Sequence, residues 1–248
     1  MRGPTIASVD VCGYRARMSA LILERIGTLD VVCLSDMSDG ERAGDAVIVL
    51  HGWGAPGDDL VPIAEALARP GARFFVPAGP LPEIGGGRAW WHLDPETRPP
   101  HAHGDRLPRD FQPTPAVVAA RGAVQALIAA IVEQHAPATV ALVGFSQGAM
   151  LATDVAIAGA PAVDRVVAMS GALLTDSVLA LTAPRATKPR FLLSHGRHDP
   201  VVPFEGGTRA KELLEKHGFT VTWRPFDGGH DIPPPLLPEI DRFLFPPV

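Results

Sequence analysis

The sequence is poor in cysteine and has no block of like charge. Its only two cysteines, Cys12 and Cys33, fit no metal-ligand spacing. Two free thiols in a reducing compartment are the favoured interpretation, with a disulfide between them as the alternative. The net charge is −5, from 22 basic and 27 acidic residues. Since nucleic acids and anionic membranes both require a basic face, neither is expected as a partner.

Long apolar runs are also absent. None reaches the roughly 18 residues of a membrane span. The longest, residues 116–134, is interrupted by Arg121 and Gln125 and therefore predicts a buried amphipathic helix, without integral membrane association. The first residues lack the apolar core of a secretory signal, so we expect a cytoplasmic protein. Residues 1–17, which precede Met18, are expected to be a disordered extension.

What the sequence does contain is an alternation of strand and helix patterns. Apolar runs that end in glycine are typical of strands buried on both faces of a parallel sheet. Segments between them have the composition of helices, at 58–71, at about 147–157 and, the longest, at 114–135. The order predicts an α/β fold in one domain, residues 18–248, with a mostly parallel sheet covered by helices on both faces. The predicted strands after the first hairpin are 45–54, 72–79, 138–144, 164–171, 188–196 and 219–226.

One connection interrupts this alternation. Residues 80–113 are rich in proline and glycine and contain the adjacent Trp90 and Trp91. Loops of this length in compact domains are usually functional or disordered, and two tryptophans favour an ordered loop. We expect this extended loop near the active site, where it could act as a partial lid.

Ser146 is the candidate for chemistry. It lies between Gly144 and Gly148 in the pattern G-x-S-x-G, where a predicted strand meets a predicted helix. The glycines let the two arms of a sharp turn pass closely, which leaves the serine hydroxyl projecting. This context predicts a nucleophile; the alternative is an ordinary serine in a strand-to-helix turn.

A serine nucleophile needs an acid and then a histidine, in that chain order. Asp199 follows one predicted strand and His230 follows the next, and the carboxyl ends of parallel strands meet at one edge of the sheet. His230 is predicted to take the proton from Ser146, and Asp199 to orient the imidazole. Four competitors are interpreted as loop or solvated residues: His195, His198, Asp227 and Asp231.

The reaction also needs two backbone N–H groups as an oxyanion hole. Gln147, directly after the nucleophile, supplies one, and Trp53 in the segment HGWG is the candidate for the other. The alternative for HGWG is a plain glycine-rich turn. The side chains of Trp53, Trp90 and Trp91 are predicted to form an apolar substrate-binding wall, with core packing as the alternative.

The loop also contains five residues that could be mistaken for metal ligands. An H-x-H in a proline-rich loop is weak evidence, and no further ligand spacing supports it. We therefore expect no metal and no cofactor. The five are His92, Asp94, His101, His103 and Asp105.

Four segments together resemble the phospholipase/carboxylesterase family of α/β-hydrolases: HGWGAPGDDL, GFSQGAMLA, HGRHDPVVPF and DGGHDIPP. RAWWHLD also matches a short R-x-W-[FW] segment of that family. The resemblance implies a cofactor-free serine esterase with Ser146, Asp199 and His230 as triad and backbone donors at positions 53 and 147. It further implies a monomer or small homodimer without a large cap domain.

The expected function is hydrolysis of small-molecule carboxylic esters with small to medium acyl chains, through an acyl-enzyme. The same machinery would serve a thioesterase or lysophospholipase acting on acyl-protein or lipid substrates, or an acyl-aminoacyl peptidase. From a different class, the alternative is a non-catalytic hydrolase-fold protein that binds an apolar ligand.

Overall fold

The computed structural model describes residues 20–35, 44–94, 100–104, 106–107, 109–159, 163–183 and 188–247. The extension predicted at residues 1–17, and Cys12 within it, lie outside these residues. The described strands form one eight-stranded sheet in the order β1-β2-β4-β3-β7-β8-β9-β10, and a separate two-stranded sheet, β5-β6.

The large sheet is antiparallel at one edge and parallel elsewhere. β1 (Ala20–Ile26) and β2 (Leu29–Ser35) form a hairpin, and β2 also pairs antiparallel with β4 (Ala72–Pro77). All other pairs are parallel, so the predicted mostly parallel sheet is confirmed. The remaining strands are β3 (Asp45–Leu50), β7 (Thr139–Phe145), β8 (Arg165–Met169), β9 (Arg190–Gly196) and β10 (Val221–Phe226).

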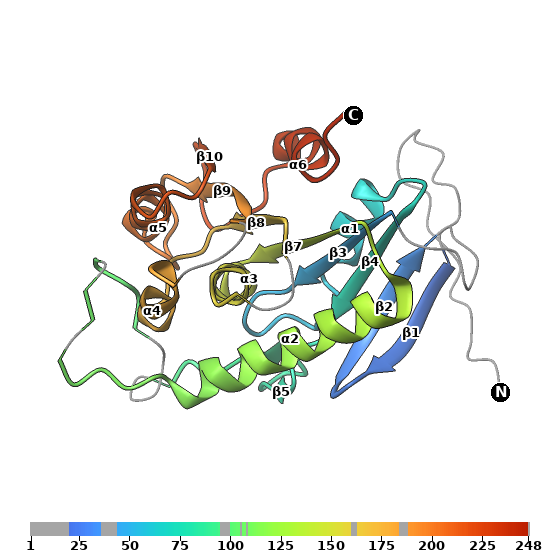
Figure 1. Ribbon diagram of the computed structural model, residues 1–248, viewed down its shortest axis with the longest axis horizontal. Coiled ribbons are helices and arrows are strands. Elements are labelled where there is room, and N and C mark those ends of the chain that lie inside the picture. Colours follow the sequence, from blue (N-terminus) through green and yellow to red (C-terminus); the bar gives the residue numbers. More distant parts are fainter. Residues whose placement is uncertain are drawn as a thin grey trace.

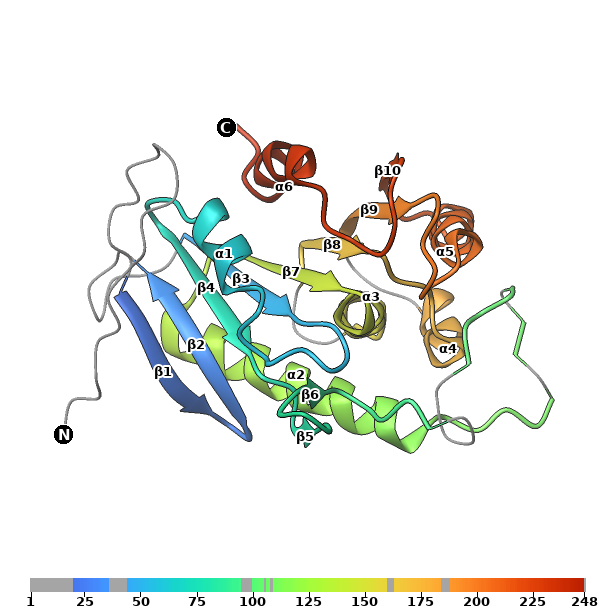
Figure 2. The ribbon, with the colours of Figure 1, turned by 180° about the vertical axis from the view of Figure 1, so that it is seen from behind.

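Helices cover both faces of this sheet (Figures 1 and 2). α1 (Val61–Leu67) and α6 (Leu237–Leu244) pack on one face. The opposite face is covered by four helices: α2 (Pro115–His135), α3 (Gln147–Ile157), α4 (Val178–Leu181) and α5 (Phe204–Lys216). Two short 3-10 helices, η1 (Thr175–Ser177) and η2 (Pro234–Leu236), precede α4 and α6.

The central strand β3 shows why its sequence is an unbroken apolar run. Ile48 and Leu50 point into the core beneath α2 and α3, whereas Val47 and Val49 point into the core beneath α1 and α6. Alternate residues of a strand face opposite sides, so a strand covered on both sides needs apolar residues at every position.

The helix α2 buries one face, as predicted, but its outer face is also largely apolar, with Val118 and Val132 exposed, so it is only weakly amphipathic. By length and composition it is the one helix in the described part of the chain that could cross a membrane. It packs instead against the sheet, and its Arg121 forms a bidentate ion pair with the fully buried Asp154 of α3, with Nε 2.6 Å from Oδ2. Its buried face comprises Val117, Ala120, Val124, Leu127, Ile128 and Ile131.

The remaining cysteine, Cys33, is a free, partly buried thiol on β2. Burial, together with the nearby Glu24 carboxylate, raises the pKa of this thiol to about 12. It therefore stays protonated at neutral pH and is a poor nucleophile, because the thiolate is the reactive form.

The connection at residues 80–113 begins with structure that its composition did not predict. β5 (Leu81–Pro82) and β6 (Arg88–Ala89) form a small hairpin. Further on, the chain runs beside the segment before α4, where Ala102 N–H donates to Leu173 O at 2.7 Å. Residues 95–99, 105 and 108 lie outside the described residues, and a role for this loop as a lid stays a prediction.

Candidate active site

Ser146 occupies a strained turn between β7 and α3. Its φ of 54° and ψ of −117° lie in a region that residues with side chains rarely adopt. A Cβ at Gly144 would lie 2.3 Å from Gly148 O, and a Cβ at Gly148 would lie 2.1 Å from Leu50 O. Both positions therefore require glycine, for the steric reason that the sequence pattern suggested.

The structure brings Ser146, His230 and Asp199 into one hydrogen-bonded chain. His230 Nε2 lies 2.9 Å from Ser146 Oγ, and His230 Nδ1 lies 2.7 Å from Asp199 Oδ2. An ionised carboxylate only accepts hydrogen bonds, so Nδ1 donates to Asp199 and leaves Nε2 to accept the serine hydroxyl proton. This is the tautomer that a general base requires.

The carboxylate of Asp199 is buried but well supplied with donors. Its Oδ1 accepts hydrogen bonds from the N–H groups of Val201 (2.8 Å) and Val202 (2.9 Å). Burial alone would raise its pKa, but the hydrogen bonds from His230, Val202 and Val201 outweigh burial and lower the pKa. The stabilisation from the ionised form is thus present above the ordinary carboxyl pKa and is lost only when the pH falls through the lowered value.

The competing residues lie elsewhere in these loops. His198 Nε2 lies 2.8 Å from Asp227 Oδ1, and both side chains are exposed. Asp231 Oδ1 accepts a hydrogen bond from Ile232 N–H. These contacts agree with the interpretation of loop hydrogen bonding and solvation. His195, the fourth competitor, is fully buried behind Asp199.

The two predicted oxyanion donors follow neighbouring strands. Trp53 lies in the loop after β3, Gln147 begins α3 just after Ser146 and β7, and β3 pairs with β7. A Cβ at Gly52 would lie 3.3 Å from the Cβ of Ser146, so the loop after β3 lies against the serine. Within the described residues, neither the Trp53 N–H nor the Gln147 N–H donates to a protein group. Both are therefore available to an anion.

His51 anchors this loop, a role that sequence reasoning missed. The ring is buried; Nδ1 donates to Gly52 O at 2.7 Å, and Nε2 accepts from Gly79 N–H at 2.8 Å. Because burial lowers its pKa, the imidazole stays neutral and keeps one donor and one acceptor. The sequence signal for this role was that His51 is the first residue of the segment HGWG, directly before Gly52.

Of the three tryptophans predicted to line a substrate wall, only Trp53 is exposed, at 45%. Trp90 and Trp91 are 1% and 2% exposed, so their prediction as an open wall is corrected. Trp90 Nε1 donates to His51 O at 3.0 Å, so the buried indole supports the loop after β3, which carries the Trp53 N–H group. Trp53 Nε1 donates to Glu83 Oε1 at 3.1 Å, which fixes its indole beside the hairpin β5–β6.

The side chain of Gln147 links the nucleophile turn to this support. Its Oε1 accepts from Trp90 N–H at 2.9 Å, and its Nε2 donates to Trp91 O at 2.8 Å. The prediction for Gln147 concerned only its backbone. These side-chain contacts join segments that lie 56 and 57 positions apart in the chain, which is why no local pattern revealed them.

Replacing Gln147 by methionine is therefore expected to destabilise the fold. Methionine has a similar volume but leaves the buried Trp90 N–H and Trp91 O without partners, at about 1–3 kcal/mol for each group. Chemical denaturation of both proteins measures the loss. Gln147→Glu is the second variant: it keeps an acceptor for Trp90 but places a buried carboxylate against the Trp91 carbonyl oxygen, so it should be destabilised as well. Equal stability of all three proteins would contradict this role.

Of the five residues considered as metal ligands, the structure describes His92, Asp94, His101 and His103, and it does not gather these four into a metal site. His92 Nδ1 lies 2.7 Å from Glu83 Oε1. In the described part of the chain, no group of three or more His, Cys, Asp or Glu side chains could hold a metal ion. Asp105 lies outside that part.

A mostly parallel sheet, with a serine on a strained strand-to-helix turn and an acid and a histidine after later strands, defines the α/β-hydrolase class. The family model described as Phospholipase/Carboxylesterase matches residues 35–245. The chain belongs to this family, as the four sequence segments predicted.

Among solved structures it resembles esterase PE8, with a TM-score of 0.71 and 29% identity over 87% of this chain and 97% of the esterase. A carboxylesterase from Mesorhizobium loti shares the fold, with a TM-score of 0.69 and 20% identity over 92% of this chain and 99% of that enzyme.

Two fungal proteins are similar in sequence. Acyl-protein thioesterase 1 of Gibberella zeae is 32% identical over 114 residues, which are 44% of this chain and 48% of the thioesterase. Acyl-protein thioesterase 1 of Neurospora crassa is 31% identical over 108 residues, which are 41% and 43% of the two chains. The chain thus spans less than half the length of these two relatives.

Proposed function

We propose that this protein is a serine hydrolase that cleaves carboxylic esters through an acyl-enzyme. The observation that carries the proposal is the hydrogen-bonded chain from Ser146 through His230 to Asp199, with His230 in the tautomer of a general base. Membership of the phospholipase/carboxylesterase family supports it.

In this mechanism Ser146 Oγ attacks the ester carbonyl carbon while His230 Nε2 takes the hydroxyl proton. The negative charge on the carbonyl oxygen is stabilised by the N–H groups of Trp53 and Gln147. When the tetrahedral intermediate collapses, His230 returns its proton to the leaving alcohol. A water molecule, activated by His230, then releases the carboxylic acid and restores Ser146. Asp199 stays ionised and stabilises the imidazolium at both stages.

Small to medium acyl chains are the proposed substrates. The backbone of Trp53 carries one of the proposed oxyanion donors, and its half-exposed indole donates to Glu83 in the turn between β5 and β6. An indole held next to the proposed oxyanion donor leaves less room for an acyl chain than a mobile side chain would. The two fungal relatives favour a second candidate, a thioesterase acting on acylated proteins. The lysophospholipase and peptidase alternatives use the same groups.

Hydrolysis of p-nitrophenyl esters from acetate to palmitate tests the proposal. We expect kcat/KM to peak at short or medium chains and to fall for palmitate. Matched butyryl ester, thioester and anilide substrates then separate the candidates: an esterase prefers the ester, and a thioesterase the thioester. A palmitate optimum would overturn the chain-length proposal, and a preference for the anilide would favour the peptidase.

Labelling with a fluorophosphonate probe separates a hydrolase from a binding protein. The probe forms a covalent bond only with an activated serine, so an unlabelled Ser146 in the folded protein would favour the non-catalytic alternative. A monomeric or homodimeric state, a single domain over residues 18–248 and a cytoplasmic location stay predictions.

A further inference from the structure

His195 is a second histidine close to the acid of the proposed triad. It lies on β9, and its side chain is 1% exposed. The ring is confined by α5: Phe204 packs edge-on at a centroid distance of 6.0 Å, and a Cβ at Gly207 would lie 2.4 Å from His195 Nδ1. Only glycine at position 207 leaves room for the imidazole, so the fold holds this ring in one orientation.

The ring is attached to the turn that carries Asp199. His195 Nε2 lies 2.8 Å from Val202 O, and since a carbonyl oxygen only accepts, Nε2 carries the proton. The N–H group of the same Val202 donates to Asp199 Oδ1 at 2.9 Å. Val202 is thus held from both sides, by the imidazole at its carbonyl and by the carboxylate at its amide.

The same Nε2 also lies 3.3 Å from Asp199 Oδ2, while its hydrogen bond goes to Val202 O. This is the oxygen that accepts the hydrogen bond from His230. Asp199 Oδ2 therefore lies between two imidazoles: His230 in front, which contacts Ser146, and His195 behind. An N–H group this close to a buried carboxylate favours its ionised form, and the shared Val202, held by both side chains, restricts how far the carboxylate can move.

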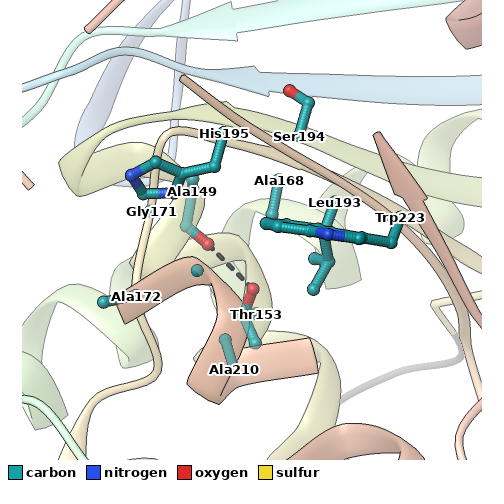
Figure 3. A pocket seen from close by; sticks show the side chains of 11 residues that line it. Ala149, Thr153, Ala168, Gly171, Ala172, Leu193, Ser194, His195, Ala210 and Trp223 are labelled. Carbon is teal, nitrogen blue, oxygen red and sulfur yellow. Dashed lines mark hydrogen bonds between the residues drawn. The ribbon is translucent and has the colours of Figure 1, made fainter. Parts of the chain in front are cut away.

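The opposite side of the His195 ring makes no polar contact. Nδ1 has no hydrogen-bond partner among the described residues. The ring borders a small cavity of about 10 Å³, which Thr153 and Trp223 also line (Figure 3). The side chain of the neighbouring Ser194 points away from the His195 ring in the same view. The polar attachment of His195 in this structure is therefore directed at the turn of Asp199.

We propose that His195 is a positioning residue for ester hydrolysis: it fixes the carboxylate of Asp199 so that Asp199 orients His230. This inference rests on the proposed function, because it assigns His195 a role only through the triad. It reverses the sequence interpretation of His195 as a loop residue. His195 does not touch the reacting atoms, and its removal should change kcat while leaving KM nearly constant.

The first experiment compares kcat and KM for p-nitrophenyl butyrate among wild type, His195→Leu and His195→Gln. We expect His195→Leu to lower kcat about 10- to 100-fold, since small misplacements of catalytic groups have effects of this size. His195→Gln should recover most of the rate, because the glutamine Nε2–H donor reaches about as far as the imidazole Nε2–H. An equal kcat in His195→Leu and wild type would overturn the proposal. A kcat of His195→Gln as low as that of His195→Leu would also overturn it.

Thr153→Val is the matched control for disturbance of the cavity. It removes the hydrogen bond from Thr153 Oγ1 to Ala149 O, 2.9 Å, in the same cavity but away from Asp199. We expect its kcat to stay within about twofold of wild type. An equal loss of kcat in Thr153→Val and His195→Leu would mean that His195 acts only through packing.

A double-mutant cycle with Asp199→Asn decides whether His195 acts through Asp199. In the Asp199→Asn background, His195→Leu should lower kcat by less than about threefold, because the carboxylate that it positions is gone. Full additivity would contradict the proposal. Failure of the proposed function looks different: wild type and Ser146→Ala would then hydrolyse the ester equally slowly, and this result would overturn the role of His195 as well.

Discussion

Replacing Ser146 by alanine is expected to lower kcat for p-nitrophenyl butyrate by at least about 10⁴-fold, with the fold intact. Without the hydroxyl, His230 has no nucleophile to activate, and only the oxyanion donors and binding remain. The rate is measured at saturating ester, and circular dichroism with thermal unfolding checks the fold. A folded variant that keeps even one tenth of the wild-type rate would show that Ser146 is not the nucleophile.

Ser194→Ala is the matched control for this experiment. Ser194 is a buried serine on the parallel strand β9, and its Oγ has no hydrogen-bond partner in the described residues. Its removal should leave kcat within about twofold of wild type. A loss in both variants would indicate a general effect of removing serine hydroxyls near this edge of the sheet.

Replacing Arg121 by methionine is expected to destabilise the protein by about 3–5 kcal/mol. Arg121 of α2 and Ser177 of η1 both bind the carboxylate of Asp154 on α3, and the Asp154 side chain is completely buried. The substitution leaves that negative charge without its cation. Urea denaturation at neutral pH measures the loss, and a value below about 1 kcal/mol would contradict it.

The same variant has an expected pH dependence. Burial raises the pKa of Asp154 above its ordinary value, whereas Arg121 and Ser177 lower it. A raised pKa in the folded state means that the proton stabilises folding at low pH and that this stabilisation is lost as the pH rises. The deficit of Arg121→Met should therefore shrink as the pH falls from 7 towards about 4. Adding Asp154→Asn should restore most of the stability, because an amide carries no charge.

Much of the fold could be predicted because its strands are buried on both faces. The predicted helix after Ser146 matches α3, residues 147–157. The helix predicted at 58–71 is shorter: α1 begins at Val61, with proline in its first turn, and ends at Leu67. The chain leaves the helical conformation at Ala68 (φ −63°, ψ 135°), and the helix could not easily continue through Arg69, because the residue directly before Pro70 disfavours that conformation.

The proximity of Ser146, Asp199 and His230 was also predictable, because strand order places loop residues at one edge of a parallel sheet. What sequence did not reveal depends on contacts across loops. The His51 ring binds Gly79 N–H, and the Gln147 side chain binds the backbone at Trp90 and Trp91. Neither contact follows a repeating pattern in the sequence. Trp90 and Trp91 were therefore predicted to line a substrate site rather than to support the loop after β3 from within the core.

The positive φ of Ser146 implies a conflict between activity and stability at this position. A non-glycine residue in such a conformation costs about 1–3 kcal/mol, which glycine would largely avoid. Selection for thermal resistance alone would thus favour losing the proposed nucleophile. A strained serine at this turn is expected where its reactivity is used, and thermostable variants are better sought away from the turn.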